Sequence, residues 1–176
     1  MELNKGKSKF TTKDMVETSL LTALVVVATY INIRLPIAAS GGLVHLGSAM
    51  LVIASLVFGK EKGAIAGAVG MAIFDLSSGW ALWAPFTFVI RGVMGYILGA
   101  IAYSNNKNGN NNIINIFAVI ISGIWMIGGY YIAEVILYGN WISPVASIPG
   151  DVTQIVMALL IGIPMVKILK KHVKYI

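Results

Sequence analysis

The sequence predicts an all-α integral membrane protein, a bundle of six transmembrane helices with both termini in the cytoplasm. Of the 176 residues, 57% are hydrophobic and only 11% are charged, whereas a soluble domain carries roughly 25% charged residues. Apolar segments long enough to cross a bilayer recur along the chain, separated by polar or glycine-containing connections. We therefore expect one membrane domain and no appended soluble domain.

The expected organisation is a cytoplasmic N-terminal arm over residues 1–13, followed by a membrane domain over residues 14–172. A spanning helix needs about 20 mainly apolar residues, and the arm is polar and basic. The expected spans are about 14–33, 43–58, 64–78, 86–103, 113–138 and 151–169.

The first expected span is too long to be the core of a signal peptide, which has about 7–15 apolar residues. Ser19 and Ala23 lie four residues apart on it, and such small side chains let another helix approach closely. Packing within the protein and docking to a partner membrane protein both fit this stripe, and the spacing alone favours packing. Residues 34–42, with Pro36 and a Gly-Gly pair, predict a loop before the short second span.

The third and fourth spans are predicted to pack tightly, because each carries small residues four apart. A charged turn at 59–63 precedes them, and an aromatic turn at 79–85 joins them. Asp75 on one and Arg91 on the other are costly within a membrane and therefore mark a site. We expect them to form a structural ion pair that ties the two spans together, with ligand contact as the weaker alternative.

The fifth span is long and contains Glu134, flanked by tyrosines. The sixth starts after Pro149-Gly150, so Asp151 is expected to be its N-cap residue. Gln154, one turn further on, faces the same way as Asp151. Pro164 is expected to kink this helix near its inner end.

The distribution of basic residues predicts the orientation. Eleven of the thirteen Lys and Arg residues lie in the N-terminal arm, the second-to-third and fourth-to-fifth connections, and the C-terminal end. Cytoplasmic segments carry such an excess, so this side is expected to be the cytoplasm. The net charge of +6 then reflects topology, and nucleic acid is not expected as a partner.

With this orientation, the ionisable residues within the spans fall in the outer half of the membrane, beside several aromatic residues. A channel or proton relay would need polar groups through the full thickness, so the pattern favours a pocket open to the outside. Aromatic walls with a few polar groups suit a small planar ligand. The expected ligand contacts are His45, Trp83, Tyr131, Glu134, Asn140, Trp141, Asp151 and Gln154.

Catalytic motifs are missing from the sequence: it has no G-x-S-x-G, no H-E-x-x-H, no phosphate-binding loop and no cysteine. We expect no enzyme activity, no metal site and no cofactor.

Three segments resemble one family. They are Gly41-Gly42-Leu43-Val44-His45-Leu46-Gly47-Ser48, the run Phe58–Gly67, and the stretch from Phe74-Asp75 through Trp83-Ala84-Pro85 to Arg91-Gly92. They resemble the substrate-binding S component of an energy-coupling factor (ECF) vitamin transporter. The resemblance is strongest to the branch for hydroxymethylpyrimidine or pyridoxine-type vitamers, near the riboflavin S components.

The resemblance implies a six-helix, multi-pass protein of the bacterial plasma membrane that binds a vitamin near the outer face. It implies a transmembrane coupling protein and two ATPase subunits as partners, and a toppling motion that carries the ligand inward. The coupling protein docks on an Ala-xxx-Ala stripe of the first helix, which Ser19 and Ala23 match here, with serine in place of the first alanine.

The ligand stays open at this stage. Hydroxymethylpyrimidine or a vitamin B6 vitamer is favoured, with riboflavin, a queuosine precursor or folate as alternatives. A stand-alone secondary transporter would need an ion site near the midplane and usually two related halves, and the sequence shows no internal repeat. A membrane-embedded enzyme would need a second polar cluster.

Overall fold

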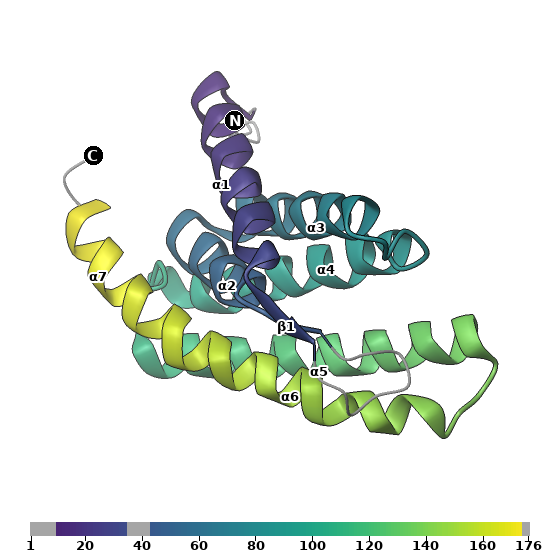
Figure 1. Cartoon of the computed structure of the whole chain (residues 1–176). Helices are drawn as coiled ribbons and strands as arrows, with labels where there is room; N and C mark the ends of the chain where they lie inside the picture. Colours follow the sequence, from purple (N-terminus) through teal and green to yellow (C-terminus); the bar gives the residue numbers. More distant parts are fainter. Residues whose placement is uncertain (1–9, 35–42, 174–176) are drawn as a thin grey trace, which may run out of the picture.

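The computed structural model describes residues 10–34 and 43–173, which fold into a helical bundle (Figure 1). Residues 1–9 of the expected arm, and most of the expected loop with Pro36 and the Gly-Gly pair, lie outside the described residues. Within the described part, the long helical elements are α1 (Thr12–Tyr30), α2 (Gly47–Phe58), α3 (Lys60–Ser77), α4 (Ala84–Ala102), α5 (Asn112–Tyr138), and a last helix that combines α6 (Ile148–Met157) and α7 (Ile163–Val173). This described part is all-α, apart from a short hairpin.

That hairpin precedes the central helix of the bundle. Strands β1 (Asn32–Arg34) and β2 (Leu43–His45) pair antiparallel, with Asn32 opposite His45. Helix α2 therefore starts at Gly47, whereas the sequence pattern places a span from residue 43. Its twelve residues rise about 18 Å, and ten of them are buried. A helix that is apolar all round belongs in the core of the bundle.

Helices α3 and α4 pack closely along their length (Figure 1). Gly95 of α4 lies directly against the α3 backbone: a Cβ atom there would be 2.7 Å from the carbonyl oxygen of Gly63. Helix α3 begins at Lys60, because Gly59 makes the turn alone with φ of +95°. The expected charged turn at 59–63 is therefore mostly helix.

A cluster of charged residues joins α1 to the start of α3. The Lys62 ammonium lies 2.7 Å from an Asp14 carboxylate oxygen and also binds Glu17. Partial burial lowers the pKa of Lys62, but the hydrogen bonds to Asp14 and Glu17 outweigh this, so its pKa lies above the ordinary value. Further along α1, Ser19 and Ala23 are exposed.

The last helix contains a wide turn. Residues Ala158–Gly162 are π-helical and connect α6 to α7, and Pro164 is the second residue of α7. A π turn holds one residue more than an ideal α-helical turn needs, and proline adds the loss of a backbone donor. The structure shows a wide turn that ends two residues before Pro164, and the kink at the proline itself stays a prediction.

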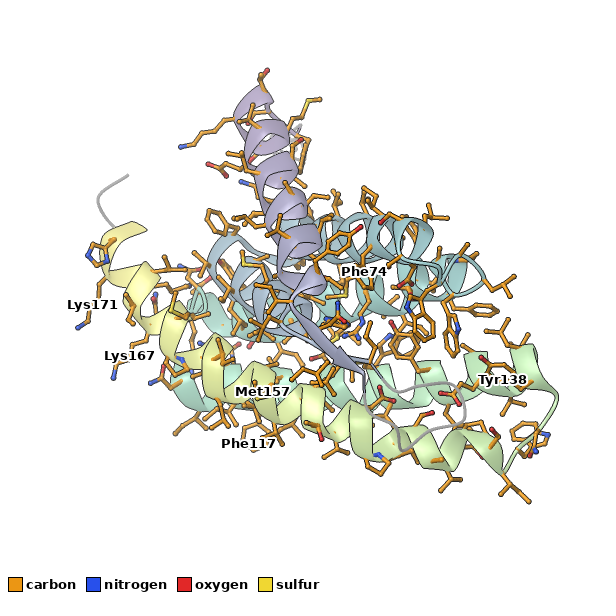
Figure 2. All side chains as sticks on the ribbon, viewed as in Figure 1. Phe74, Phe117, Tyr138, Met157, Lys167 and Lys171 are labelled. Carbon is orange, nitrogen blue, oxygen red and sulfur yellow. The ribbon has the colours of Figure 1, made fainter. Side chains whose placement is uncertain are left out.

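Within the part of the chain that the structure describes, three helical stretches are by length and composition able to cross a membrane: Ala84–Ala102, Asn112–Tyr138 and Ser143–His172. Helices α1 and α3 are of comparable length to the first of these, but both carry several charged residues. The lysines of α7 gather at one end of the molecule: Figure 2 shows Lys167 and Lys171 far from Tyr138, which ends α5.

Candidate ligand-binding site

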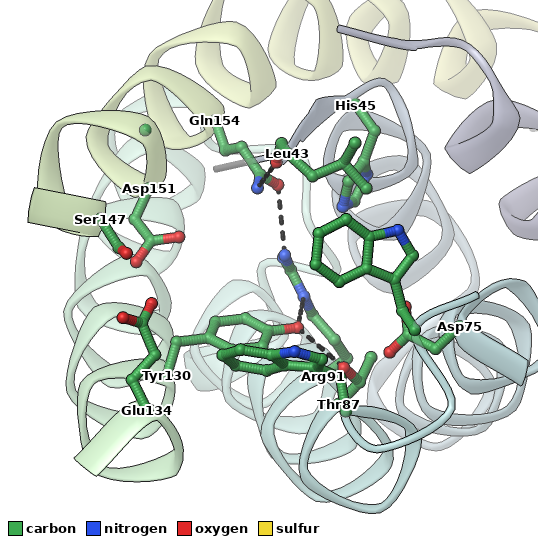
Figure 3. A pocket seen from close by; sticks show the side chains of 13 residues that line it. Leu43, His45, Asp75, Thr87, Arg91, Tyr130, Glu134, Ser147, Asp151 and Gln154 are labelled. Carbon is green, nitrogen blue, oxygen red and sulfur yellow. Dashed lines mark hydrogen bonds between the residues drawn. The ribbon is translucent and has the colours of Figure 1, made fainter. Parts of the chain in front are cut away.

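A partly open pocket with a cavity volume of about 100 Å³ lies where α3, α4, α5 and α6 meet beside the hairpin (Figure 3). It is at the end of the bundle that holds the α3–α4 turn. Its lining combines three carboxyl groups, one guanidinium, three large aromatic rings and several neutral polar groups. The lining residues are Leu43, His45, Asp75, Trp80, Trp83, Thr87, Arg91, Tyr130, Glu134, Ser147, Gly150, Asp151 and Gln154.

Arg91 forms the base of this pocket and is almost fully buried, with 1% of its surface exposed. All three guanidinium nitrogens donate to protein acceptors. Nε donates to the Tyr130 hydroxyl at 3.0 Å, and Nη2 donates to the Gln154 amide oxygen at 3.2 Å. Nη1 donates to Ser48 Oγ at 3.0 Å and approaches Met126 Sδ at 2.9 Å. Neutral groups therefore satisfy this buried cation.

Gln154 connects that base to the hairpin. Its amide oxygen also accepts a hydrogen bond from Ser48 Oγ at 2.6 Å, and its amide nitrogen donates to the Leu43 carbonyl oxygen at 2.5 Å. The side chain is 5% exposed. One residue of α6 thus holds β2, the start of α2 and the guanidinium of α4 in fixed relative positions.

Two of the carboxyl groups have an unsatisfied oxygen. Asp75 Oδ2 and Glu134 Oε2 are buried and have no hydrogen-bond partner among the described residues. Thr87 is within hydrogen-bonding range of Asp75, and Ser147 is within range of Glu134. The carboxyl groups of Asp151 and Glu134 are close enough to interact electrostatically. Buried polar atoms are normally paired, so these oxygens are ready-made acceptors for a ligand.

Aromatic rings form the walls of the pocket. The Trp83 and Tyr130 rings lie 6.1 Å apart at 49°, and the Tyr130 ring also stacks on the guanidinium of Arg91 at 5.1 Å. Trp80 lines the same space from the α3–α4 turn. Large π faces with a few polar groups at their edges are suited to a flat heteroaromatic ligand.

Helical spacing explains why these residues converge. Thr87 and Arg91 lie four apart on α4, and Tyr130 and Glu134 lie four apart on α5, so each pair shares one helix face. Helix α6 begins at Ile148, which puts Asp151 in its first turn and makes Ser147 the capping position. The expectation that Asp151 is the N-cap residue is therefore wrong, and its side chain is directed toward the pocket (Figure 3).

Five of the eight expected ligand contacts line the pocket: His45, Trp83, Glu134, Asp151 and Gln154.

The other three do not. Asn140 Oδ1 accepts hydrogen bonds from the Ile142 and Ser143 backbone, 2.7 Å and 3.3 Å away, and so shapes the α5–α6 turn. Trp141 is 68% exposed, and its carbonyl oxygen accepts a 2.6 Å hydrogen bond from the Tyr131 hydroxyl. Tyr131 is one position off the pocket-facing side of α5.

The expected ion pair between Asp75 and Arg91 does not form. The two residues are close enough to interact electrostatically, but no salt bridge joins them, and the guanidinium extends toward α2, α5 and α6 instead. Both side chains belong to the pocket. Arg91 braces four elements rather than two.

Several lining residues were not among the expected contacts, most notably Thr87, Tyr130 and Ser147. A signal for the first two was present, because each lies four residues from a charged residue already singled out, Arg91 and Glu134. Trp80, from the aromatic turn, also lines the pocket. Within residues 10–34 and 43–173, no three His, Cys, Asp or Glu side chains are grouped to hold a metal ion.

Comparison with known proteins places this architecture among transporter subunits. The family model described as "ECF-type riboflavin transporter, S component" matches residues 9–171. A solved structure of the S component of a bacterial ECF transporter superposes with a TM-score of 0.70 at 20% identity, covering 92% of this chain and 98% of that one. At that identity, the likeness shows the fold.

Relatives in other organisms are more similar in sequence. A protein of Pyrococcus woesei described as uncharacterised is 34% identical over 148 residues, which is 84% of this chain and 96% of that protein. The thiamine precursor transporter HmpT of Lactococcus lactis is 28% identical over 123 residues, 70% of this chain and 67% of HmpT. A UPF0397 protein of Streptococcus pneumoniae is 35% identical over 92 residues, about half of each chain.

Proposed function

Because this chain belongs to the family of ECF-type riboflavin transporter S components, we propose that it captures a pyrimidine-type vitamin precursor at the outer face of the membrane. Proteins of this family are multi-pass membrane proteins and the substrate-binding subunits of transporters, not enzymes. To this family-level role, the proposal adds the chemical class of the ligand, the side of the membrane from which the ligand enters, and the residues that bind it.

The observation that carries the proposal is a pocket with aromatic walls and unsatisfied acceptors. Asp75 and Glu134 each keep a buried oxygen without a partner among the described residues, and Trp80, Trp83 and Tyr130 flank them. A ring with amino and hydroxyl substituents would satisfy the acceptors while stacking on the indoles.

The choice of a pyrimidine over other vitamins is supported by the Lactococcus lactis relative, whose name states a thiamine precursor. Hydroxymethylpyrimidine is the pyrimidine precursor we favour. A vitamin B6 vitamer has a similar size and similar substituents, but no relative reported above is named for it. Riboflavin, named in the family model, is the comparison ligand for the experiment.

We further propose that both termini are cytoplasmic and that the chain works with a transmembrane coupling protein and two ATPase subunits. The pocket and the lysines of α7 lie at opposite ends of the bundle, as the excess of positive charge in cytoplasmic segments predicts. Ser19 and Ala23 are both exposed on α1, so this stripe is open to a partner helix.

The test is ligand titration of the purified protein in lipid nanodiscs by calorimetry, with hydroxymethylpyrimidine, pyridoxine and riboflavin. We expect the pyrimidine to bind most tightly. Gln154→Ala should weaken that binding at least tenfold, because the base of the pocket loses the acceptor that holds Arg91. Asn140→Ala is the control and should bind normally, because Asn140 shapes a turn outside the pocket. Stronger binding of riboflavin than of the pyrimidine would refute the proposed ligand.

A further inference from the structure

The balance of charge in the pocket restricts what can bind there. Three carboxyl groups line it, from Asp75, Glu134 and Asp151, against the single guanidinium of Arg91. Each nitrogen of that guanidinium already donates to Tyr130, Ser48 or Gln154. A negatively charged ligand would therefore meet three acidic side chains and a cation whose donors are in use.

The carboxyl groups also have a definite arrangement. Figure 3 shows Glu134 and Asp151 side by side at one side of the pocket, from α5 and α6, and Asp75 at the opposite side, from α3. Glu134 and Asp75 are 4% and 8% exposed, and each keeps one buried oxygen without a partner in the described structure. Two adjacent carboxyl groups such as those of Glu134 and Asp151 are unfavourable together in their charged forms unless a proton donor or a cation lies between them.

From this arrangement we infer that the pocket selects a ring carrying nitrogen donors, with an amino group held between Glu134 and Asp151 and a second donor on Asp75. The same arrangement excludes phosphorylated and carboxylated forms of the ring. This inference rests on the proposed function and names the chemical class that the site accepts: neutral or cationic, amino-substituted heteroaromatic compounds.

The selectivity follows from the cost of unpaired buried groups. A site built to bind a donor rejects an analogue without it, because its own acceptors then stay buried and unsatisfied. An amino group offers two N–H donors to two facing carboxylates, whereas an oxo group in the same position offers only lone pairs. A phosphate ester adds at least one negative charge to a pocket in which Arg91 is the single cationic side chain of the described lining, and its donors are already in use.

The experiment uses three forms of one ring: 4-amino-5-hydroxymethyl-2-methylpyrimidine, its 4-oxo counterpart, and the phosphate ester of the amino form. Dissociation constants are measured by calorimetry on the full chain in nanodiscs. We expect the oxo form to bind at least tenfold more weakly than the amino form, and the ester at least a hundredfold more weakly.

Variants then assign the selectivity to residues. The double variant Glu134→Gln with Asp151→Asn keeps the side-chain shapes and removes both ionisable carboxyl groups, so the penalty on the phosphate ester should fall at least tenfold. Glu61→Gln is the matched control, because it removes an exposed carboxylate from the first turn of α3, far from the pocket. Circular dichroism and melting temperature establish that each variant is folded.

The outcomes separate the inference from the proposed function. If the amino form binds but the oxo form or the ester binds within threefold of it, the inference is wrong while the proposed function stands. The assignment to Glu134 and Asp151 is also overturned if the double variant keeps the full penalty on the ester. If no pyrimidine binds and riboflavin does, both the proposed ligand and the inference fail.

Discussion

Replacing Gly95 with alanine should loosen the contact between α3 and α4. An added Cβ would lie 2.7 Å and 2.8 Å from the carbonyl oxygen and carbon of Gly63, and 2.9 Å from the Cα of Ala64. These are backbone atoms, which cannot rotate away as a side chain could. Overpacking of this kind costs about 1–3 kcal/mol, and the upper end applies here because the helices themselves must separate.

Alanine also has a favourable effect, since it restricts the unfolded chain and suits a helix better than glycine by about 0.5–1 kcal/mol. The net loss of unfolding free energy for Gly95→Ala is therefore about 2 kcal/mol. Gly128→Ala on α5 isolates the favourable part, because nothing lies within 4 Å of a Cβ at that position. The two variants, chemically identical, should differ by about 3 kcal/mol.

Reversible unfolding of the purified protein in mixed micelles, followed by circular dichroism, measures both values. Ligand titration adds a second readout, since α3 carries Asp75 and α4 carries Arg91, so a shift between the helices should also weaken binding. Equal stability of Gly95→Ala and Gly128→Ala would refute the close packing of α3 on α4.

Three further predictions concern other parts of the molecule. Ser19→Trp should prevent co-purification with the coupling protein and leave ligand affinity unchanged; an intact complex on size-exclusion chromatography would rule out this docking face. Because the pKa of Lys62 is raised in the folded state, the stability that it contributes is complete below its ordinary pKa of about 10.4 and is lost as pH rises through the higher folded value. The melting temperature should thus fall less between pH 9 and 11 in Lys62→Gln than in the wild type, and equal losses would contradict this. Arg91→Lys should cost about 1–3 kcal/mol of unfolding free energy, because one ammonium cannot reach Tyr130, Ser48 and Gln154 together; wild-type stability in the unfolding assay would show that the network is dispensable.

The helical fold class follows from hydropathy alone, and the family follows from local motifs. The first residues of α2 and α3 could not be predicted from hydropathy or motifs, for physical reasons. Residues 43–45 are apolar and fit a span equally well, but backbone pairing with β1 makes them a strand. Lys60 and Lys62 suggest a turn by their charge, but a single glycine with positive φ is sufficient to connect the two helices.

Pocket residues could be predicted from the sequence where depth in the membrane decides whether a side chain lines the pocket, as for Glu134 and Gln154. They could not be predicted where the rotation of a side chain about its helix axis decides this. Tyr130 and Tyr131 are equivalent in composition and depth, and only the register of α5 puts the first in the pocket. The direction of a long side chain is also set by the tertiary structure, which is why Arg91 could be identified as important but was assigned the wrong partner.

The π-helical turn at Ala158–Gly162 also makes the last helix tolerant of a change in length. Its additional residue shifts α7 by one sequence position relative to α6, which corresponds to about 100° of rotation about the helix axis. Deleting exposed Leu160 would return the turn to α-helical geometry and leave both halves on their present faces. The same deletion placed in α6 would rotate every later residue and take Val166, 2% exposed, out of the core. Homologues with one residue fewer in this helix are therefore expected to have lost it within this turn.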